Sequence, residues 1–192
     1  MHRPGHAGCL TVLIGVVLCA CGTPDLEPQT PKAPAAAPRR LRPSAFVSLA
    51  EPIQQNLAQR GCMVPQTYPD SLAHNVFSGR FTSREQVDVA VLCLRDTTSV
   101  ILVYRAGLAD SVMEVAPRPH LRAELSDTGA GFTFSRAVGI ADSAFIQSRF
   151  EAYGGTRPPT LDHHGINDIF PGKGSVVWYW HRGGWLQLQG SD

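Results

Sequence analysis

The sequence has no excess of charge of either sign and no hydrophobic run long enough to span a membrane. Its 192 residues include 17 Lys and Arg against 16 Asp and Glu, a formal net charge of +1. This balance argues against a strongly basic nucleic-acid-binding protein and against an acidic tail protein. The apolar stretch at residues 9–18 has about half of the roughly 20 residues that a transmembrane helix needs. Because 43% of the residues are apolar, the chain can still bury a core.

Common catalytic and metal-binding motifs are also missing. The chain contains no HExxH, no CxxC pair and no GxSxG. The stretch Gly172-Lys173-Gly174-Ser175 lacks the upstream glycine of a phosphate loop and predicts a turn. The histidines beyond the N-terminal region do not have the spacing of a zinc site: His74, His120, His163, His164 and His181. No reaction follows from these motifs.

The first residues have the organisation of an export signal. Arg3 precedes the apolar stretch, which ends at Leu18-Cys19-Ala20-Cys21. This tetrapeptide resembles the bacterial lipobox, in which an apolar residue lies three places before a Cys that follows Ala or Gly. The resemblance implies a lipoprotein signal peptide at residues 1–20. Cys21 would then begin the mature chain, with diacylglycerol on its sulfur and an acyl chain such as palmitate on its amine. The alternative is an ordinary secretory signal that leaves Cys21 as a thiol.

The residues after Cys21 predict the compartment and a tether. Three acyl chains hold a protein permanently on a membrane, whereas one chain binds reversibly. By analogy with enterobacterial sorting, Gly22 in place of Asp favours the outer membrane, with the domain in the periplasm. Residues 22–43 contain six prolines and predict a polyproline-rich tether with a reach of up to roughly 70 Å. At its far end Arg39, Arg40 and Arg42 are either solvated or in contact with anionic surfaces or peptidoglycan.

Residues 44–192 form the predicted globular domain, which begins with a helix. Apolar residues recur there every three or four positions, the spacing of one helical face: Phe46, Leu49, Ile53 and Leu57. Gly61 predicts the end of this helix. Ser48 and Glu51 form a capping box, but this start would place Pro52 inside the helix without a donor. A start at Pro52 is the alternative.

The rest of the domain predicts mainly strands. Runs of β-branched residues predict a hairpin from residues 87–94 and 100–104 and strands near 111–115 and 131–135. Asp142 is expected to cap a second helix, with Ile146, Phe150 and Tyr153 on one face, and Gly154-Gly155 to end it. Residues 175–181 and 185–189 predict a final hairpin. This order predicts the α+β class: a mostly antiparallel sheet with about two helices in a single small domain.

The cysteines of the mature chain predict one disulfide bond. Once Cys21 is acylated, Cys62 and Cys93 remain, and an oxidising compartment favours their pairing. The bond would join the end of the first helix to the first central strand. In the chain-entropy model a loop of this length contributes about 3 to 4 kcal/mol. The alternative is two buried free thiols.

Residues 162–168 are the best local candidate for a metal site. Asp162 and Asp168 stand at positions one and seven around a central glycine, the outline of a calcium turn. Position three holds His164, which suits transition metals such as Zn²⁺ better than Ca²⁺. The candidate ligands are therefore Asp162, His164, Asn167 and Asp168. The alternative is a hydrogen-bonded structural turn with no cofactor.

Two stretches resemble parts of FG-GAP-type propeller blades. Residues 75–82 (NVFSGRFT) and 87–92 (VDVAVL) resemble a blade edge, and residues 162–168 resemble its loop. The resemblance implies the kind of blade found in integrin-like and cell-surface proteins, which usually binds Ca²⁺ through that loop. Residues 83–86 (SREQ) replace the acidic loop, and a chain this short cannot close a propeller. Residues 44–192 also resemble uncharacterised secreted bacterial proteins, a resemblance that implies no activity.

The final predicted hairpin contains all three tryptophans. Strand alternation places Trp178 and Trp180 on one face, where they either close the core or form a binding surface. The leading hypothesis is a lipid-anchored, non-catalytic binding or assembly module in the periplasm. Its partners would be the membrane, through the lipid, and an envelope protein or peptidoglycan, but no nucleic acid. The alternatives are an envelope hydrolase that uses Asp162, His163 or Asp168, and a purely structural envelope component.

Overall fold

The computed structural model describes residues 37–68, 72–119, 125–128 and 131–189. The predicted signal peptide, Cys21 and most of the predicted tether lie outside these residues. The described part has two α-helices, α1 (Glu51–Gln59) and α2 (Ser143–Tyr153), and two 3₁₀ helices, η1 (Pro43–Ala45) and η2 (Arg105–Gly107). None of its helices is long and apolar enough to cross a membrane. The strands are β1 (Arg40–Leu41), β2 (Val64–Pro65), β3 (Val76–Gly79), β4 (Asp88–Arg95), β5 (Thr98–Tyr104), β6 (Val112–Pro119), β7 (Leu125–Asp127), β8 (Phe132–Phe134), β9 (Ala137–Ala141), β10 (Gly165–Phe170), β11 (Gly174–His181) and β12 (Gly184–Gln189).

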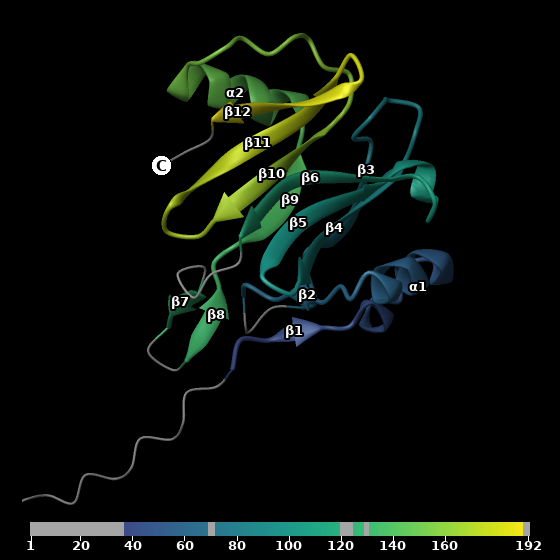
Figure 1. Cartoon of the computed structure of the whole chain (residues 1–192). Coiled ribbons are helices and arrows are strands. Elements are labelled where there is room, and N and C mark those ends of the chain that lie inside the picture. The colour runs from purple at the N-terminus through teal and green to yellow at the C-terminus, as the bar shows by residue number, and fades with distance from the viewer. Residues whose placement is uncertain (1–36, 69–71, 120–124, 129–130, 190–192) are drawn as a thin grey trace, which may run out of the picture. The chain divides into compact units, whose positions relative to one another are not determined.

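The strands build two four-stranded antiparallel sheets that stack between the two helices (Figure 1). The first sheet has the order β3-β4-β5-β6 and the second the order β12-β11-β10-β9. Helix α1 packs on the outer face of the first sheet, and α2 packs on the outer face of the second. Two short pairs, β1–β2 and β7–β8, accompany these sheets. The predicted α+β class with mostly antiparallel strands is confirmed.

Strands β4 and β5 are apolar on both sides because both faces of their hairpin are covered. Ala90 and Leu92 pack toward the second sheet, whereas Val91 and Cys93 pack toward α1. A strand buried on both faces has a continuous apolar sequence rather than an alternating one. The predicted hairpin is confirmed, with its turn at residues 96–97.

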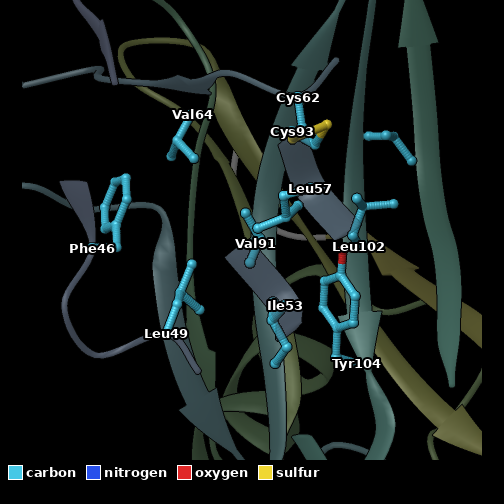
Figure 2. Packing of buried hydrophobic residues seen from close by; sticks show 11 residues of the cluster. Phe46, Leu49, Ile53, Leu57, Cys62, Val64, Val91, Cys93, Leu102 and Tyr104 are labelled. Carbon is cyan, nitrogen blue, oxygen red and sulfur yellow. A yellow bond between two sulfur atoms is a disulfide. The ribbon is translucent and has the colours of Figure 1, made fainter. Parts of the chain in front are cut away.

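Helix α1 closes the core on the outer face of the first sheet (Figure 2). Ile53 and Leu57 project from the helix into a buried cluster that includes Phe46 and Leu49. All four are at most 5% exposed, as the predicted apolar face requires. The helix ends before Gly61, whose φ of 68° is the left-handed conformation that glycine adopts easily. The predicted end of the helix is therefore confirmed.

The start of α1 differs from both predicted starts. The helix begins at Glu51, and no side chain caps it, so the capping box with Ser48 does not form. Pro52 lies in the first turn, where its missing N–H has no helical partner to lose. The side-chain amide of Gln54 donates to the carbonyl of Phe46 at 3.1 Å. This bond ties the helix to the preceding turn without a capping side chain.

The described fold begins before the predicted domain boundary at residues 43–44. Strand β1 pairs with β2, with Leu41 opposite Val64. The backbone N–H of Gln66 donates to the carbonyl of Arg39 at 2.9 Å. Backbone pairing of this kind fixes a segment that composition alone assigns to the tether, so the end of the predicted tether is part of the fold.

Helix α2 confirms the predicted cap and stop. The Asp142 carboxylate accepts the backbone N–H of Phe145 at 2.7 Å, and Gly154 follows with a φ of 72°. Ile146 is buried, but Tyr153 is 47% exposed. The buried face of α2 is therefore narrower than the spacing predicts, because the last turn of the helix leaves its aromatic ring in solvent.

The final predicted hairpin is confirmed as β11 and β12, which turn at residues 182–183. Val177 and Tyr179 pack toward α2, whereas Trp178 and Trp185 pack toward the first sheet. The alternation predicted for β11 is therefore correct. Each face of the hairpin meets a different layer of the fold.

The predicted disulfide bond joins Cys62 and Cys93 (Figure 2), with the two Cα atoms 5.4 Å apart. The neighbouring residues Met63 and Leu94 form an isolated antiparallel bridge. Both cysteines are nearly or fully buried, at 2% and 0% exposure. The bond therefore ties the segment that follows α1 to the centre of the first sheet.

Tyr104 gives a pH-dependent test of the α1 core. Its side chain is fully buried, and its hydroxyl donates to Asn56 at 3.0 Å. Burial raises the pKa of Tyr104 to about 12, against about 10 in an unfolded chain. The folded state therefore keeps the proton longer, so this stability is complete below about pH 10 and is lost as the pH rises toward 12.

We expect the free energy of unfolding to fall in this pH range by on the order of 2 kcal/mol from this group. The variant Tyr104→Phe should lack this part of the loss, whereas Tyr153→Phe, which changes an exposed ring, should keep it. Urea unfolding at a series of alkaline pH values measures the difference. Equal pH slopes for Tyr104→Phe and the parent would contradict the prediction.

Candidate functional site

The residues predicted to bind a metal do not converge on one point. Successive side chains of a strand point to opposite faces, so Asp168 shares the inter-sheet face of β10 with Ile166, while Asn167 lies on the α2 side. Asp162 and His164 lie in the loop before this strand. Within the described residues, no three His, Cys, Asp or Glu side chains are placed to hold a metal ion. Two of the four predicted ligands, Asn167 and Asp168, therefore lie on opposite faces of β10.

Asp168 is buried in an ion pair with Arg136. The Nε atom of Arg136 donates to one carboxylate oxygen at 2.8 Å, and an Nη atom donates to the other at 2.9 Å. The two residues are 1% and 3% exposed. Both oxygens of Asp168 are thus engaged by a fixed guanidinium. This carboxylate therefore contributes to the structure of the buried interior.

The remaining donors of Arg136 reach across to the first sheet. One Nη atom donates to the carbonyl and the hydroxyl of Ser99, at 3.0 and 2.9 Å. The other donates to the carbonyl of Ala116 at 2.9 Å. The hydroxyl of Thr67 donates in turn to the Arg136 carbonyl. Arg136 therefore links the second sheet to β5, to β6 and to the segment after β2.

His163 holds the loop before β10 against β11. Its Nδ1 lies 2.9 Å from a carboxylate oxygen of Asp162, and its Nε2 lies 2.9 Å from the carbonyl oxygen of Trp180. The hydrogen bond from His163 holds the pKa of Asp162 below its usual value. A general acid needs a raised pKa instead, so Asp162 is not suited to that role. The imidazole is mostly enclosed, with 10% of its side chain exposed.

His164 is held by the end of β3. Its backbone N–H donates to the carbonyl of Arg80 at 2.7 Å, and its Nδ1 accepts the backbone N–H of Arg80 at 3.2 Å. Its ring also lies edge-on to Phe81, with centroids 6.5 Å apart. These contacts favour the hydrogen-bonded structural turn, the alternative that the sequence leaves open.

The tryptophans of the final hairpin do not form a flat exposed surface. Trp178 is half-buried against the apolar cluster between the sheets. Trp180 packs edge-on against Trp185, with ring centroids 5.6 Å apart. Much of the surface predicted for binding is therefore covered in the fold. Trp178 packs against the cluster between the sheets, and Trp180 packs against Trp185.

Asp88 lies in the stretch that resembles a propeller blade, and its hydrogen bonds hold that stretch in place. One oxygen of its carboxylate accepts the N–H of Phe81 and both the N–H and the hydroxyl of Thr82, at 2.8 to 3.1 Å. The other accepts the Gln86 amide at 2.6 Å and the N–H of Ala106 at 2.9 Å. Asp88 is fully buried, so it organises the loop between β3 and β4 and is not exposed to a ligand.

A cavity of about 440 Å³ lies between α1, residues 42–44 and residues 61–63. We call it the α1 pocket. It is lined by Arg42, Pro43, Ser44, Glu51, Gln54, Gln55, Ala58, Gly61, Cys62 and Met63. Three separate segments form it, so no local sequence pattern signals it. Its wall combines apolar side chains, amides and a hydroxyl with one positive and one negative group.

A second cavity of about 310 Å³ lies between α2 and residues 157–161. Neither this cavity nor the α1 pocket is lined by Asp162, His163 or Asp168. His120 lies outside the described residues. Among the surfaces described here, the α1 pocket is the better candidate for a ligand, because it is larger and has more apolar wall.

Mutation can distinguish the structural roles of the two carboxylates in the predicted metal loop. Asp168→Asn leaves the guanidinium of Arg136 buried without its counter-charge, and we expect a loss of about 3 to 5 kcal/mol in the free energy of unfolding. Asp162→Asn, at a side chain that is 63% exposed, should cost far less, because an exposed charge pair contributes little to stability. Urea unfolding of both variants measures this. Equal effects would contradict the structural role assigned to Asp168.

Comparison with protein-family models, with curated proteins and with solved structures finds no match to this chain.

Proposed function

We infer that this chain is an exported protein, held on the bacterial membrane by lipid on Cys21, whose domain is a non-catalytic binding or assembly module in the periplasm. The lipobox-like Leu18-Cys19-Ala20-Cys21 and the proline-rich tether support the anchor. Gly22 favours the outer membrane. The observation that carries the proposal is the Cys62–Cys93 disulfide bond, because such bonds persist in oxidising compartments outside the cytosol.

The chemistry of the α1 pocket favours binding over catalysis. Its ionisable side chains are Arg42 and Glu51, and the only sulfur nucleophile in its wall, that of Cys62, is used in the disulfide. The hydroxyl of Ser44 has no histidine beside it in the wall, so a nucleophile and base pair is missing there. Gln54 and Gln55 offer amides beside apolar carbon. A peptide or another ligand with apolar groups and hydrogen-bonding atoms suits this wall.

The hydrolase alternative has less support. It needs a pair of titratable groups around a space that a substrate can enter. Asp168 is bonded through both oxygens to Arg136. Asp162 and His163 hold each other at the surface. These contacts leave the loop before β10 without a carboxylate suited to general acid catalysis.

Lipid anchoring is tested by changing Cys21 to Ser. The parent chain should incorporate labelled palmitate and should stay in the membrane pellet after a high-salt wash, which removes proteins held by charge alone. Cys21→Ser should lose both properties. The matched control Cys19→Ser changes the neighbouring cysteine and should keep both. A salt-resistant pellet for Cys21→Ser would overturn the anchoring proposal.

Binding at the α1 pocket is tested by site-specific photo-crosslinking in whole envelopes. A crosslinker at Gln55, in the pocket wall, should give a discrete adduct that a second substitution, Ala58→Trp, removes by filling the pocket. A crosslinker at Gln147, in the wall of the other cavity, and the exposed substitution Ala144→Trp are the controls. An adduct at Gln55 that survives Ala58→Trp would contradict the pocket assignment. No adduct at all would favour the structural envelope component.

A further inference from the structure

Three arginines at the start of the described fold are held in place by backbone pairing. Arg40 lies in β1, opposite Pro65 of β2. The carbonyl of Arg39 accepts the N–H of Gln66 at 2.9 Å, and Arg42 follows immediately before η1. All three side chains are exposed. The short strand β1 and the residues on either side of it therefore present these three charges.

The charge around this strand is not balanced locally. None of Arg39, Arg40 and Arg42 forms an ion pair with a carboxylate of the described residues. Between residues 37 and 66 the only acidic side chain is Glu51. The remaining arginine of this stretch, Arg60, lies 3.5 Å from Glu114. The stretch therefore presents three cationic groups against one carboxylate, in a chain whose net charge is close to zero.

An exposed apolar side chain follows these charges in the sequence. Val47, in the turn between η1 and α1, is 96% exposed. The residues on either side behave differently, because Phe46 and Leu49 point into the core (Figure 2). An exposed aliphatic group beside arginines is typical of surfaces that meet the interfacial region of a membrane, where charge attracts the headgroups and the apolar group enters between them.

The position of this surface in the chain supports a bilayer as its partner. Residues 22–38 separate it from Cys21, and 17 residues reach at most roughly 50 Å in polyproline-II geometry. Among the described residues, β1 is the first strand after the predicted lipid. The surface is confined to within this reach of the headgroups, and its positive charge complements anionic phospholipids.

We propose that Arg39, Arg40, Arg42 and Val47 form a docking surface for anionic phospholipid headgroups, which holds the domain against the membrane to which it is tethered. The proposal rests on the anchoring inferred above. Because Arg42 also lines the α1 pocket, docking would place that pocket beside the headgroups. Its ligand would then be a molecule at the membrane surface.

The test uses the predicted mature chain from residue 22 onward, so that vesicle binding depends neither on lipidation nor on the apolar stretch of the signal peptide. We expect it to sediment with vesicles of phosphatidylglycerol and phosphatidylethanolamine but not with phosphatidylcholine vesicles. The triple variant Arg39→Gln, Arg40→Gln and Arg42→Gln should bind the anionic vesicles on the order of a hundredfold more weakly, at about fivefold per arginine. Binding of the parent should weaken as salt rises.

Two controls separate this surface from a general effect of charge. The variant Arg84→Gln, Arg105→Gln and Arg182→Gln removes the same charge from exposed positions elsewhere and should bind as the parent does. Val47→Ser should weaken binding severalfold while leaving its salt dependence unchanged, because it removes apolar contact and no charge.

Three results would overturn the docking proposal: equal loss in both triple variants, equal binding to both vesicle types, or binding to isolated peptidoglycan sacculi in place of vesicles. Loss of palmitate labelling in the parent chain would instead overturn the lipid anchor. The two proposals can therefore fail separately.

Discussion

The ion pair between Arg136 and Asp168 is the contact on which the stacking of the two sheets depends. A charge moved from water into a protein interior costs several kcal/mol unless its hydrogen-bonding groups are satisfied. Here the guanidinium finds an acceptor for each of its N–H groups, on Asp168, on Ser99 and on the carbonyl of Ala116. These acceptors belong to both sheets, so the bonds form together only when the sheets meet in one register.

Asp88 and Asp168, two buried carboxylates, stabilise the fold. This role limits the places where a functional site can lie. Asp168 holds one sheet to the other, and Asp88 accepts four hydrogen bonds from the loop between β3 and β4 and a fifth from Ala106 in η2. Groups satisfied in this way are not available for acid–base chemistry or for a hard cation. The surface around α1 and β1, with its pocket and its unpaired arginines, offers different chemistry: apolar contact, amides and positive charge. This difference between the buried carboxylates and the surface around α1 and β1 agrees with the proposed module, which binds a partner at the membrane.

Local signals in the sequence predicted both α-helices and six of the twelve described strands, β4, β5, β6, β8, β11 and β12. Alternation and β-branched runs predicted the two main hairpins, and Asp142 and Gly154 predicted both ends of α2. These predictions succeed because the interactions that end an element lie within a few residues of it. The capping box at Ser48 was wrong because a turn tied by Gln54 takes its place. The alternative start at Pro52 lies one residue from the observed start at Glu51. Strand β1 was missed because its partner, β2, lies more than twenty residues away.

The sequence by itself determined the α+β class and the Cys62–Cys93 pairing, since composition, cysteine count and short-range periodicity are properties of the chain alone. The lipobox-like leader stays a prediction from the sequence. The tertiary structure decided that Asp168 forms a buried ion pair. The spacing between Asp162 and Asp168 resembles that of a metal-binding loop. Strand alternation instead points the Asp168 side chain between the sheets, where it pairs with the guanidinium of Arg136, a residue distant in the sequence. The α1 pocket likewise exists only after three separate segments meet. A side chain's neighbours across a fold are set by how faces pack, and one strand's sequence does not contain that information.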